Sequence, residues 1–290
     1  MHYNEAANIL GKHPCFSGEA HVKHGRIHLP VSPVCNIQCR FCKRSINKFE
    51  ERPGVSRKIL TPEESLEILD RALKLCPDIT VVGIAGPGDT LASPHALDTF
   101  ELVHEKHPEL IKCMSTNGLM LEPNVRRILK VGVKTITVTV NAVDPDILTN
   151  ICSHILCNGG SMTGKPAAVQ LIAAQMEGIR KAAALGLIVK VNTVLVPGVN
   201  DGHIGDVAKT AAGLGAAMMN IIPLIPQFEM SHISAPDCDM LSAAREAAER
   251  HLVVFRHCRH CRADACGIPG KGIDIADRLY ERRVETFSHG

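Results

Sequence analysis

The chain has 290 residues, of which 45% are hydrophobic and 21% charged, which is ordinary for a globular protein with one large domain or two small ones. A net charge of +2, without a basic stripe interleaved with aromatic residues, argues against nucleic acid as a partner. No apolar run approaches the roughly 20 residues that span a bilayer, and no secretory signal is recognisable, so we expect a cytoplasmic protein without a membrane partner.

Behind an N-terminal arm, predicted strands alternate with predicted helices. Clusters of β-branched and apolar residues predict strands at 26–32, 79–86, 111–118, 133–142, 187–196 and 218–225. Ser-Pro or Thr-Pro starts and closing glycines help to predict helices at 61–76, 93–107, 122–132, 166–186 and 201–215. A further helix at 239–252 and a short strand after it are predicted near the C-terminus.

This alternation predicts parallel strands joined by crossover helices. Six strand–helix units are two fewer than a closed eightfold barrel contains. The expected fold is therefore α/β, a partial six-unit TIM-like barrel over residues 26–226. We expect residues 1–25 to form a separate arm and residues 227–290 to form a C-terminal extension.

Twelve cysteines are many for a chain of this kind, and reduced thiols in such numbers more often bind metal than form disulfides. Two groups stand out, Cys35, Cys39 and Cys42, and Cys258, Cys261 and Cys266. The first group places three thiols within eight residues, which does not close a tetrahedral zinc site unaided. Three thiolates can instead hold three irons of a 4Fe–4S cluster and leave the fourth iron open. In the second group, the pair Cys258 and Cys261 taken alone is also compatible with a zinc knuckle.

The stretch CNIQCRFC (35–42) resembles the signature of the radical S-adenosylmethionine (SAM) superfamily. That resemblance implies a partial six-unit barrel, in which the open iron binds SAM and an electron splits its sulfonium to give a 5′-deoxyadenosyl radical. It also implies that AGPGD (85–89), STNG (115–118), TVNAVDP (139–145) and the strand before VPGVND (196–201) bind SAM. The implied SAM-binding residues are Gly86, Pro87, Gly88, Asp89, Ser115, Thr116, Asn117, Asn141 and Asn192.

Further motifs are HPC (13–15), RIHLPVSPVCNIQCRFC (26–42), AGPGDTLA (85–92) and CRHCRADA (258–265). With them the chain resembles the NifB family, the radical SAM enzymes of nitrogenase cofactor assembly, from about His13 to the CRADACG segment. The resemblance implies three 4Fe–4S clusters, one catalytic and two auxiliary. Their implied ligands are Cys35, Cys39 and Cys42 for the radical cluster, Cys15, His28 and Cys113 for the first auxiliary cluster, and Cys258, Cys261 and Cys266 for the second.

The family resemblance also implies a reaction. The two auxiliary clusters would fuse into an 8Fe-9S-C cluster, the precursor of the iron–molybdenum (FeMo) cofactor. One SAM would donate a methyl group to a cluster sulfide, as a transferase does, and a second would yield the radical that strips hydrogen from that methyl, a lyase type of step. The implied partners are cluster donors, product carriers or scaffolds, and an electron donor of the ferredoxin or flavodoxin type.

Two departures from the family pattern are visible. Relatives often carry a further cysteine after the triad, whereas KRSINKFEERPG (43–54) has none. Glu50 or Glu51 is a candidate catalytic residue there, as a transient ligand, and a solvated loop acid is an equally good interpretation. Second, the chain ends 24 residues after Cys266, so we expect a stand-alone form without the C-terminal carrier domain of many relatives.

Simpler interpretations stay open at this point. A histidine on an apolar strand, such as His28, is more often a satisfied core residue than a ligand. Cys152 and Cys157 lie in a Gly- and Ser-rich segment expected to be a loop, where free thiol and ligand are both open. For the whole chain, the alternatives are another radical SAM maturase acting on a peptide or small molecule, and an electron carrier or cluster store, which would not need a barrel.

Overall fold

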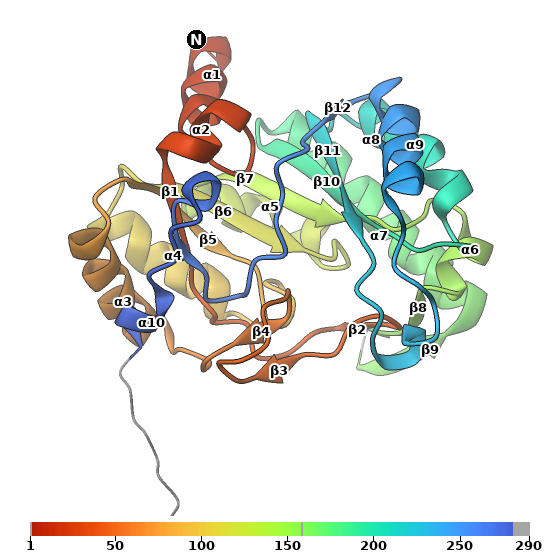
Figure 1. Ribbon diagram of the computed structural model, residues 1–290, viewed down its shortest axis with the longest axis horizontal. Coiled ribbons are helices and arrows are strands. Elements are labelled where there is room, and N and C mark those ends of the chain that lie inside the picture. Colours follow the sequence, from red (N-terminus) through yellow and green to blue (C-terminus); the bar gives the residue numbers. More distant parts are fainter. Residues whose placement is uncertain (1, 158, 281–290) are drawn as a thin grey trace, which may run out of the picture.

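The computed structural model describes residues 2–157 and 159–280. Its centre is a curved sheet that runs across the molecule in Figure 1. Six parallel strands form it, β1 (Gly25–His28), β5 (Ile79–Ile84), β6 (Ile111–Thr116), β7 (Val133–Thr139), β10 (Ile188–Leu195) and β11 (Met218–Pro223). Strands that follow one another in this series are neighbours in the sheet, as crossover connections require. The predicted α/β partial barrel is confirmed.

Two short strands extend the sheet at its ends. Next to β11 lies β12 (Val253–Val254), which is parallel to it. At the other end β13 (Cys266–Gly267) pairs antiparallel with β1, and Cys266 is opposite Ile27. The C-terminal segment therefore returns to the first strand of the barrel.

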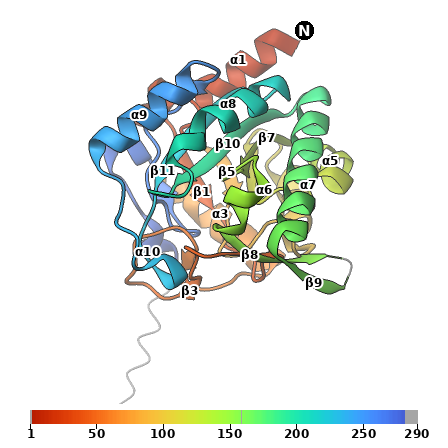
Figure 2. The same cartoon turned by 90° about the vertical axis from the view of Figure 1, so that its right-hand side faces the viewer.

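Helices cover the outer face of the sheet (Figures 1 and 2). The crossover helices are α3 (Pro62–Leu75), α4 (His95–Lys106), α5 (Leu121–Lys130), α7 (Gly164–Ala184) and α8 (Ile204–Gly213), the last preceded by the 3-10 turn η1 (Asp201–His203). Thr61 and Glu64 form a capping box that starts α3, as the Thr-Pro sequence predicts. Between these helices and the strands lies one apolar core, in which Leu69, Phe100 and Ile136 are fully buried.

The remaining helices flank the barrel. The arm contains α1 (His2–Lys12) and α2 (Gly18–Lys23), which the sequence does not predict. The extension contains η2 (Phe228–Met230), the predicted α9 (Cys238–Glu249), η3 (Pro269–Lys271) and α10 (Ala276–Leu279). Within the described ranges, no helix is long and apolar enough to cross a membrane.

The loops after β1 and β7 form two further small sheets. One joins β3 (Ser45–Ile46) to β4 (Val55–Ser56). The other is antiparallel and joins β2 (Ile37–Cys39), β8 (Cys152–Cys157) and β9 (Gly160–Thr163), after the short helix α6 (Pro145–Thr149). The segment of Cys152 and Cys157, expected to be a loop, is therefore a strand, and Cys39 is opposite Cys152.

Candidate functional site

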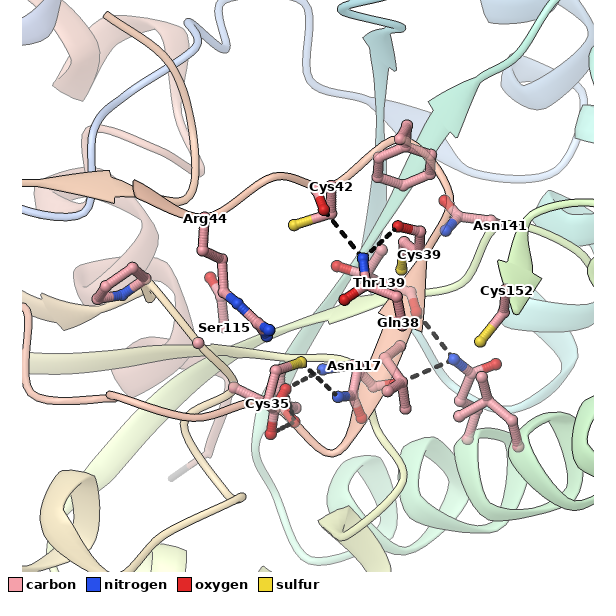
Figure 3. A pocket seen from close by; sticks show the side chains of 18 of the residues that line it. Cys35, Gln38, Cys39, Cys42, Arg44, Ser115, Asn117, Thr139, Asn141 and Cys152 are labelled. Carbon is pink, nitrogen blue, oxygen red and sulfur yellow. Dashed lines mark hydrogen bonds between the residues drawn. The ribbon is translucent and has the colours of Figure 1, made fainter. Parts of the chain in front are cut away.

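Three thiols face one cavity at the carboxyl end of the sheet. The cavity has a volume of about 190 Å³, and Cys35, Cys39 and Cys42 line it together with residues that follow β5, β6 and β7 (Figure 3). Gln38 braces their loop, since its Nε2 donates to the carbonyls of Cys39 at 2.8 Å and Cys42 at 2.9 Å. The structure thus brings the predicted triad together.

The donor chemistry of the triad fits an iron–sulfur cluster. Burial raises the pKa of Cys35 to about 11, with a smaller contribution from Asp89, and it also raises the pKa values of Cys39 and Cys42. Such thiols lose their protons when a metal group binds. Within residues 2–157 and 159–280, no three His, Cys, Asp or Glu side chains are placed to hold a single metal ion. Three soft ligands around a cavity suit a larger iron–sulfur group.

The AGPGD segment fixes the loop that carries Cys35. The Gly88 amide donates to the carbonyl of Ser32 and the Asp89 amide to that of Val34, both at 2.8 Å. A Cβ atom on Gly88 would lie 2.0 Å from the Val34 carbonyl oxygen, so only glycine permits this approach. Gly86 has a φ of 126°, which also favours glycine, and it lines neither cavity of the site.

Asp89 links this segment to the end of β6. Its carboxylate accepts hydrogen bonds from the Thr116 hydroxyl at 3.0 Å and from the amides of Asn117 at 2.5 Å and Leu91 at 2.9 Å. Burial raises the pKa of Asp89, and these hydrogen bonds oppose that effect. A carboxylate with this many protein partners is better suited to positioning than to the SAM contact predicted for it.

Asn117 continues the chain of contacts to the triad. Its Nδ2 donates to Asn36 Oδ1 at 2.6 Å and lies 3.8 Å from Cys35 Sγ. The other predicted SAM residues on this cavity are Pro87, Gly88, Ser115, Thr116 and Asn141, whereas Asn192 lines the neighbouring one.

Sequence reasoning misses Gln175 on this cavity, and it leaves open whether Cys152, which also lines it, is a ligand or a free thiol. Gln175 Nε2, from α7, donates to the carbonyls of Asn117 at 2.7 Å and Thr139 at 2.9 Å, while its buried Oε1 has no partner among the described residues. A buried acceptor of this kind suits a ligand that carries N–H or O–H groups. A single glutamine on a long helix gives no signal in the sequence.

A second cavity, of about 320 Å³, adjoins the first. The two share six lining residues, Phe41, Cys42, Ala85, Pro87, Ser115 and Thr139. Five predicted auxiliary-cluster ligands line the second cavity, Cys15, His28, Cys113, Cys258 and Cys261. They come from the arm, β1, β6 and the C-terminal segment, and the fold gathers them at one place.

His28 has the form that a metal ligand requires. Its Nδ1 lies 3.2 Å from the carbonyl of Arg262, which can only accept, so Nδ1 carries the proton and Nε2 keeps its lone pair. Burial, assisted by the charge of Arg26, lowers the pKa of His28 to about 4, so the ring is neutral at pH 7. Burial also raises the pKa of Cys15 to about 12.

Besides Gly86, three predicted site residues line neither cavity. Cys266 is fully buried in the hydrophobic core and lines neither cavity. It is paired with Ile27, so it lies on the helix-covered face of the sheet, opposite to the face on which Arg26 and His28 line the cavity. Glu50 and Glu51 also line neither cavity. The Glu50 carboxylate accepts from Asn47 Nδ2 at 2.5 Å and Arg52 Nη2 at 2.8 Å. The structure thus gives Cys266 no contact with either cavity, and it places neither glutamate on a cavity wall.

Comparisons with known proteins identify the family of the chain. The Radical SAM superfamily model matches residues 29–211. The FeMo cofactor biosynthesis protein NifB of Methanocaldococcus jannaschii is 46% identical over 264 residues, covering 90% of this chain and 88% of the relative. The NifB protein of Chlorobaculum tepidum is 41% identical over 266 residues, covering 90% and 63%.

Among solved structures, Streptococcus suis SuiB superposes with a TM-score of 0.58 at 12% identity, covering 87% of this chain and 52% of that one. This likeness shows the shared fold. The matched residues 29–211 include the cysteine triad and four of the six parallel strands, β5, β6, β7 and β10. The chain belongs to the radical SAM superfamily and, within it, to the NifB family.

Proposed function

We propose that this enzyme of FeMo-cofactor biosynthesis fuses two 4Fe–4S clusters and inserts a SAM-derived carbide and an extra sulfur, giving the 8Fe-9S-C precursor. Family membership supports the assignment of the chain as a radical SAM enzyme of FeMo-cofactor biosynthesis. The single observation that carries the proposal of cluster fusion and carbide insertion is the pair of adjoining cavities. One is lined by the triad, and the other by five cluster-type ligands.

Cys35, Cys39 and Cys42 would hold the resident cluster in the first cavity. With SAM bound, that cluster supplies the 5′-deoxyadenosyl radical. The protein's part is to hold the loop through Gln38 and to line the SAM site. The proposed SAM-contacting residues are Pro87, Gly88, Ser115, Thr116, Asn117, Asn141 and Asn192, with Gly86 and Asp89 shaping the backbone behind them.

The two auxiliary clusters are substrates. We assign Cys15, His28 and Cys113 to one and Cys258 and Cys261 to the other. Methyl transfer from one SAM to a cluster sulfide, followed by hydrogen abstraction from that methyl, requires the substrates to lie next to the SAM site. The six shared lining residues support that proximity. Sites with three or fewer protein ligands release iron more readily than four thiolates do, which suits cargo that must leave.

The loop after the triad offers a further ligand. Arg262 donates to the carbonyl of Asn47 at 2.7 Å and to that of Glu50, so the loop is tied to the segment of Cys258 and Cys261. We propose that Glu50 is the transient ligand from this loop. Glu51, the next residue, serves as the control. Glu50→Gln should then lower the yield of fused cluster, whereas Glu51→Gln should not.

In this proposal the arm (1–25) and the extension (227–290) supply cluster ligands to the barrel (26–226). The proposed partners of the enzyme are cluster donors, product carriers and a reductant of the ferredoxin or flavodoxin type. These assignments follow the family and the cluster chemistry.

The test is anaerobic reconstitution followed by SAM and dithionite. We expect about twelve irons per chain, three clusters of four each, with both 5′-deoxyadenosine and S-adenosylhomocysteine formed. Cys39→Ala should abolish SAM cleavage, whereas Cys258→Ala should keep some cleavage and yield no fused cluster. Four to eight irons without S-adenosylhomocysteine would instead indicate a maturase of peptides or small molecules.

A further inference from the structure

The second cavity is lined by positive charge without a carboxylate. Arg26, Lys190 and Arg259 line it, and none of its other lining residues is Asp or Glu. Arg26 is 4% exposed and Lys190 is 3% exposed. Burying a cation away from water is costly unless an anion or hydrogen-bond acceptors compensate. In the described part of the chain, neither residue forms an ion pair with a carboxylate, although the charge of Asp274 acts on Arg26.

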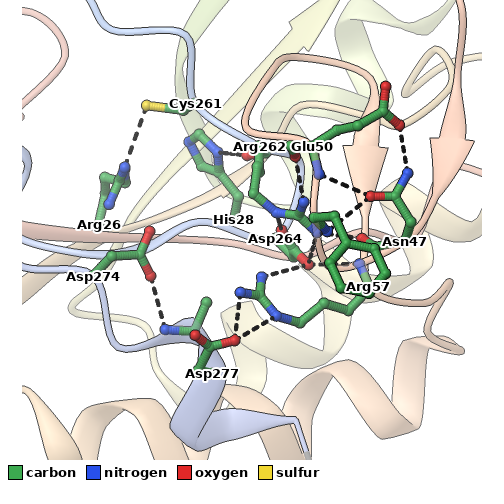
Figure 4. Close-up of polar contacts among 12 residues, drawn as sticks. Arg26, His28, Asn47, Glu50, Arg57, Cys261, Arg262, Asp264, Asp274 and Asp277 are labelled. Carbon is green, nitrogen blue, oxygen red and sulfur yellow. Dashed lines mark hydrogen bonds and ion pairs between the residues drawn. The ribbon is translucent and has the colours of Figure 1, made fainter.

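Arg26 donates two hydrogen bonds to the C-terminal segment. Its Nη1 donates to the carbonyl of Gly267 at 3.1 Å. Its Nη2 donates to Cys261 Sγ at 3.2 Å (Figure 4). The Nε–H is buried and has no partner among the described residues. The strand β1 thus presents a cation directly to one of the thiols assigned to the second substrate cluster.

Lys190 approaches the other substrate site. Its Nζ donates to the carbonyl of Cys15 at 2.8 Å and lies over the rings of Phe16 and Phe255, 4.4 and 5.4 Å from their centroids. The aromatic rings favour a charged ammonium at this position. One carbonyl engages one of the three N–H donors, and the group is held at the cavity wall.

We propose that Arg26 and Lys190 are positioning residues that bind the anionic iron–sulfur cargo of the second cavity. On two thiolates and otherwise neutral ligands, a 4Fe–4S cluster has no net charge when oxidised and becomes negative when it gains an electron. Two reduced clusters in one cavity repel each other unless cations lie beside them. Arg26 holds the Cys261 sulfur through its N–H group, and Lys190 neutralises the cluster at Cys15. This inference rests on the proposed function, because it takes the two clusters as the cargo.

The N–H···S contact has a measurable consequence. Hydrogen bonds and cations near cluster sulfur stabilise the reduced, more negative state and so raise the reduction potential. Removing the charge of Arg26 should lower the potential of the cluster at Cys258 and Cys261. The radical cluster, in the neighbouring cavity, should keep its potential.

The experiment uses the full chain, loaded anaerobically with ferrous iron and sulfide, and compares Arg26→Met and Lys190→Met with Arg26→Lys and Lys190→Arg. Lys112→Met is the matched control, because Lys112 is also buried on a strand of this sheet, binds two carbonyls and lines neither cavity. The readouts are iron per chain, cluster spectra, and the potential of each cluster from a redox titration followed by electron paramagnetic resonance. Circular dichroism checks that each variant is folded.

We expect the two Met variants to drop from about twelve irons to about eight or fewer. Any auxiliary cluster left in Arg26→Met should have a lower potential. The charge-conserving variants should recover most of the loading, and Lys112→Met should load as the wild type does. Wild-type loading and potentials in folded Arg26→Met and Lys190→Met would overturn the inference.

Adding SAM and dithionite to the loaded wild type separates this inference from the proposed function. A wild type that loads about twelve irons but forms no fused cluster would refute the function and leave the cationic site standing. A wild type that loads only the radical cluster would overturn both, because no cargo then enters the cavity.

Discussion

The guanidinium of Arg57 lies 3.0 Å from the carboxylate of Asp264, although the two residues are 207 positions apart. The Arg57 amide donates to the same oxygen at 2.6 Å, and Arg262 Nε donates to the other oxygen at 2.8 Å (Figure 4). Asp264 is 1% exposed and Arg262 is 2% exposed. One buried carboxylate thus fastens the segment of Cys258 and Cys261 to the start of the barrel.

Asp264→Asn should therefore destabilise the fold strongly. The change leaves the buried Arg262 guanidinium without its counter-charge and leaves Arg57 only the exposed Asp277. Breaking a buried pair in this way costs about 3–5 kcal/mol. Denaturant unfolding should show the loss, and auxiliary-cluster loading should fall with it. Asp146→Asn is the control, because the exposed pair of Asp146 with Lys165 contributes at most about 1 kcal/mol. Equal stability of the two variants would contradict the assignment.

The same carboxylate predicts a pH dependence. Burial alone would raise the pKa of Asp264, but the hydrogen bonds from Arg262 and from the Arg57 amide lower it below the ordinary value. Because the folded-state pKa is the lower one, the stabilisation is present above the ordinary value of about 3.9 and is lost as pH falls through the folded-state pKa. Unfolding of the cluster-free chain should show the wild-type advantage over Asp264→Asn shrinking below about pH 4. An advantage that stays constant down to pH 3 would argue against this role.

Gly88→Ala should disable the radical site. The added methyl would lie 2.0 Å from the Val34 carbonyl oxygen, so the loop that carries Cys35 must move. We expect a loss of about 1–3 kcal/mol in unfolding free energy and a larger loss of 5′-deoxyadenosine formation. Gly202→Ala meets open space and should stay within about 0.5 kcal/mol of the wild type. Normal SAM cleavage by Gly88→Ala would show that the close approach is not needed.

Cys266 and Cys261 should respond differently to alanine. Cys261 lines the second cavity and contacts Arg26, whereas Cys266 is enclosed by the hydrophobic core. Cys266→Ala should keep the iron content and lose only the stability of a small buried side chain, about 1 kcal/mol. Cys261→Ala should lose an auxiliary cluster. Iron analysis of the two variants under the same loading conditions decides the matter, and loss of a cluster from Cys266→Ala would restore it as a ligand.

Much of the site follows from local sequence, and the reasons are physical. The spacing of Cys35, Cys39 and Cys42 and the glycines of AGPGD encode short loops, whose geometry depends on neighbours in the chain. The alternating strands fix which loops share the carboxyl edge of the sheet. The grouping of Cys113 with Cys15 came from the family resemblance, because Cys15 lies in the arm, outside the strand–helix alternation.

Other features depend on contacts between distant segments and leave no local signal. Pairing of β13 with β1 buries Cys266, although its spacing from Cys258 and Cys261 suggests a ligand. Pairing of β2 with β8 turns an apparent Gly- and Ser-rich loop into a strand and places Cys152 opposite Cys39. The Arg26–Cys261 contact arises in the same way, because the C-terminal segment returns to the first strand.

Gln175 offers a test of a residue found only in the structure. Its Nε2 satisfies the carbonyls of Asn117 and Thr139, two segments that line the SAM cavity. Gln175→Glu replaces that donor with a carboxylate that can only accept, so both carbonyls lose their partner and face a negative charge. Each buried carbonyl left unpaired costs about 1–3 kcal/mol, and the segments should separate. We expect SAM affinity, measured by equilibrium dialysis, to fall by at least about tenfold, equivalent to about 1.4 kcal/mol.

The control is Gln170→Glu, because Gln170 is an exposed residue on the same helix. This variant should bind SAM as the wild type does. Equal affinity of both variants would mean that Gln175 does not shape this cavity.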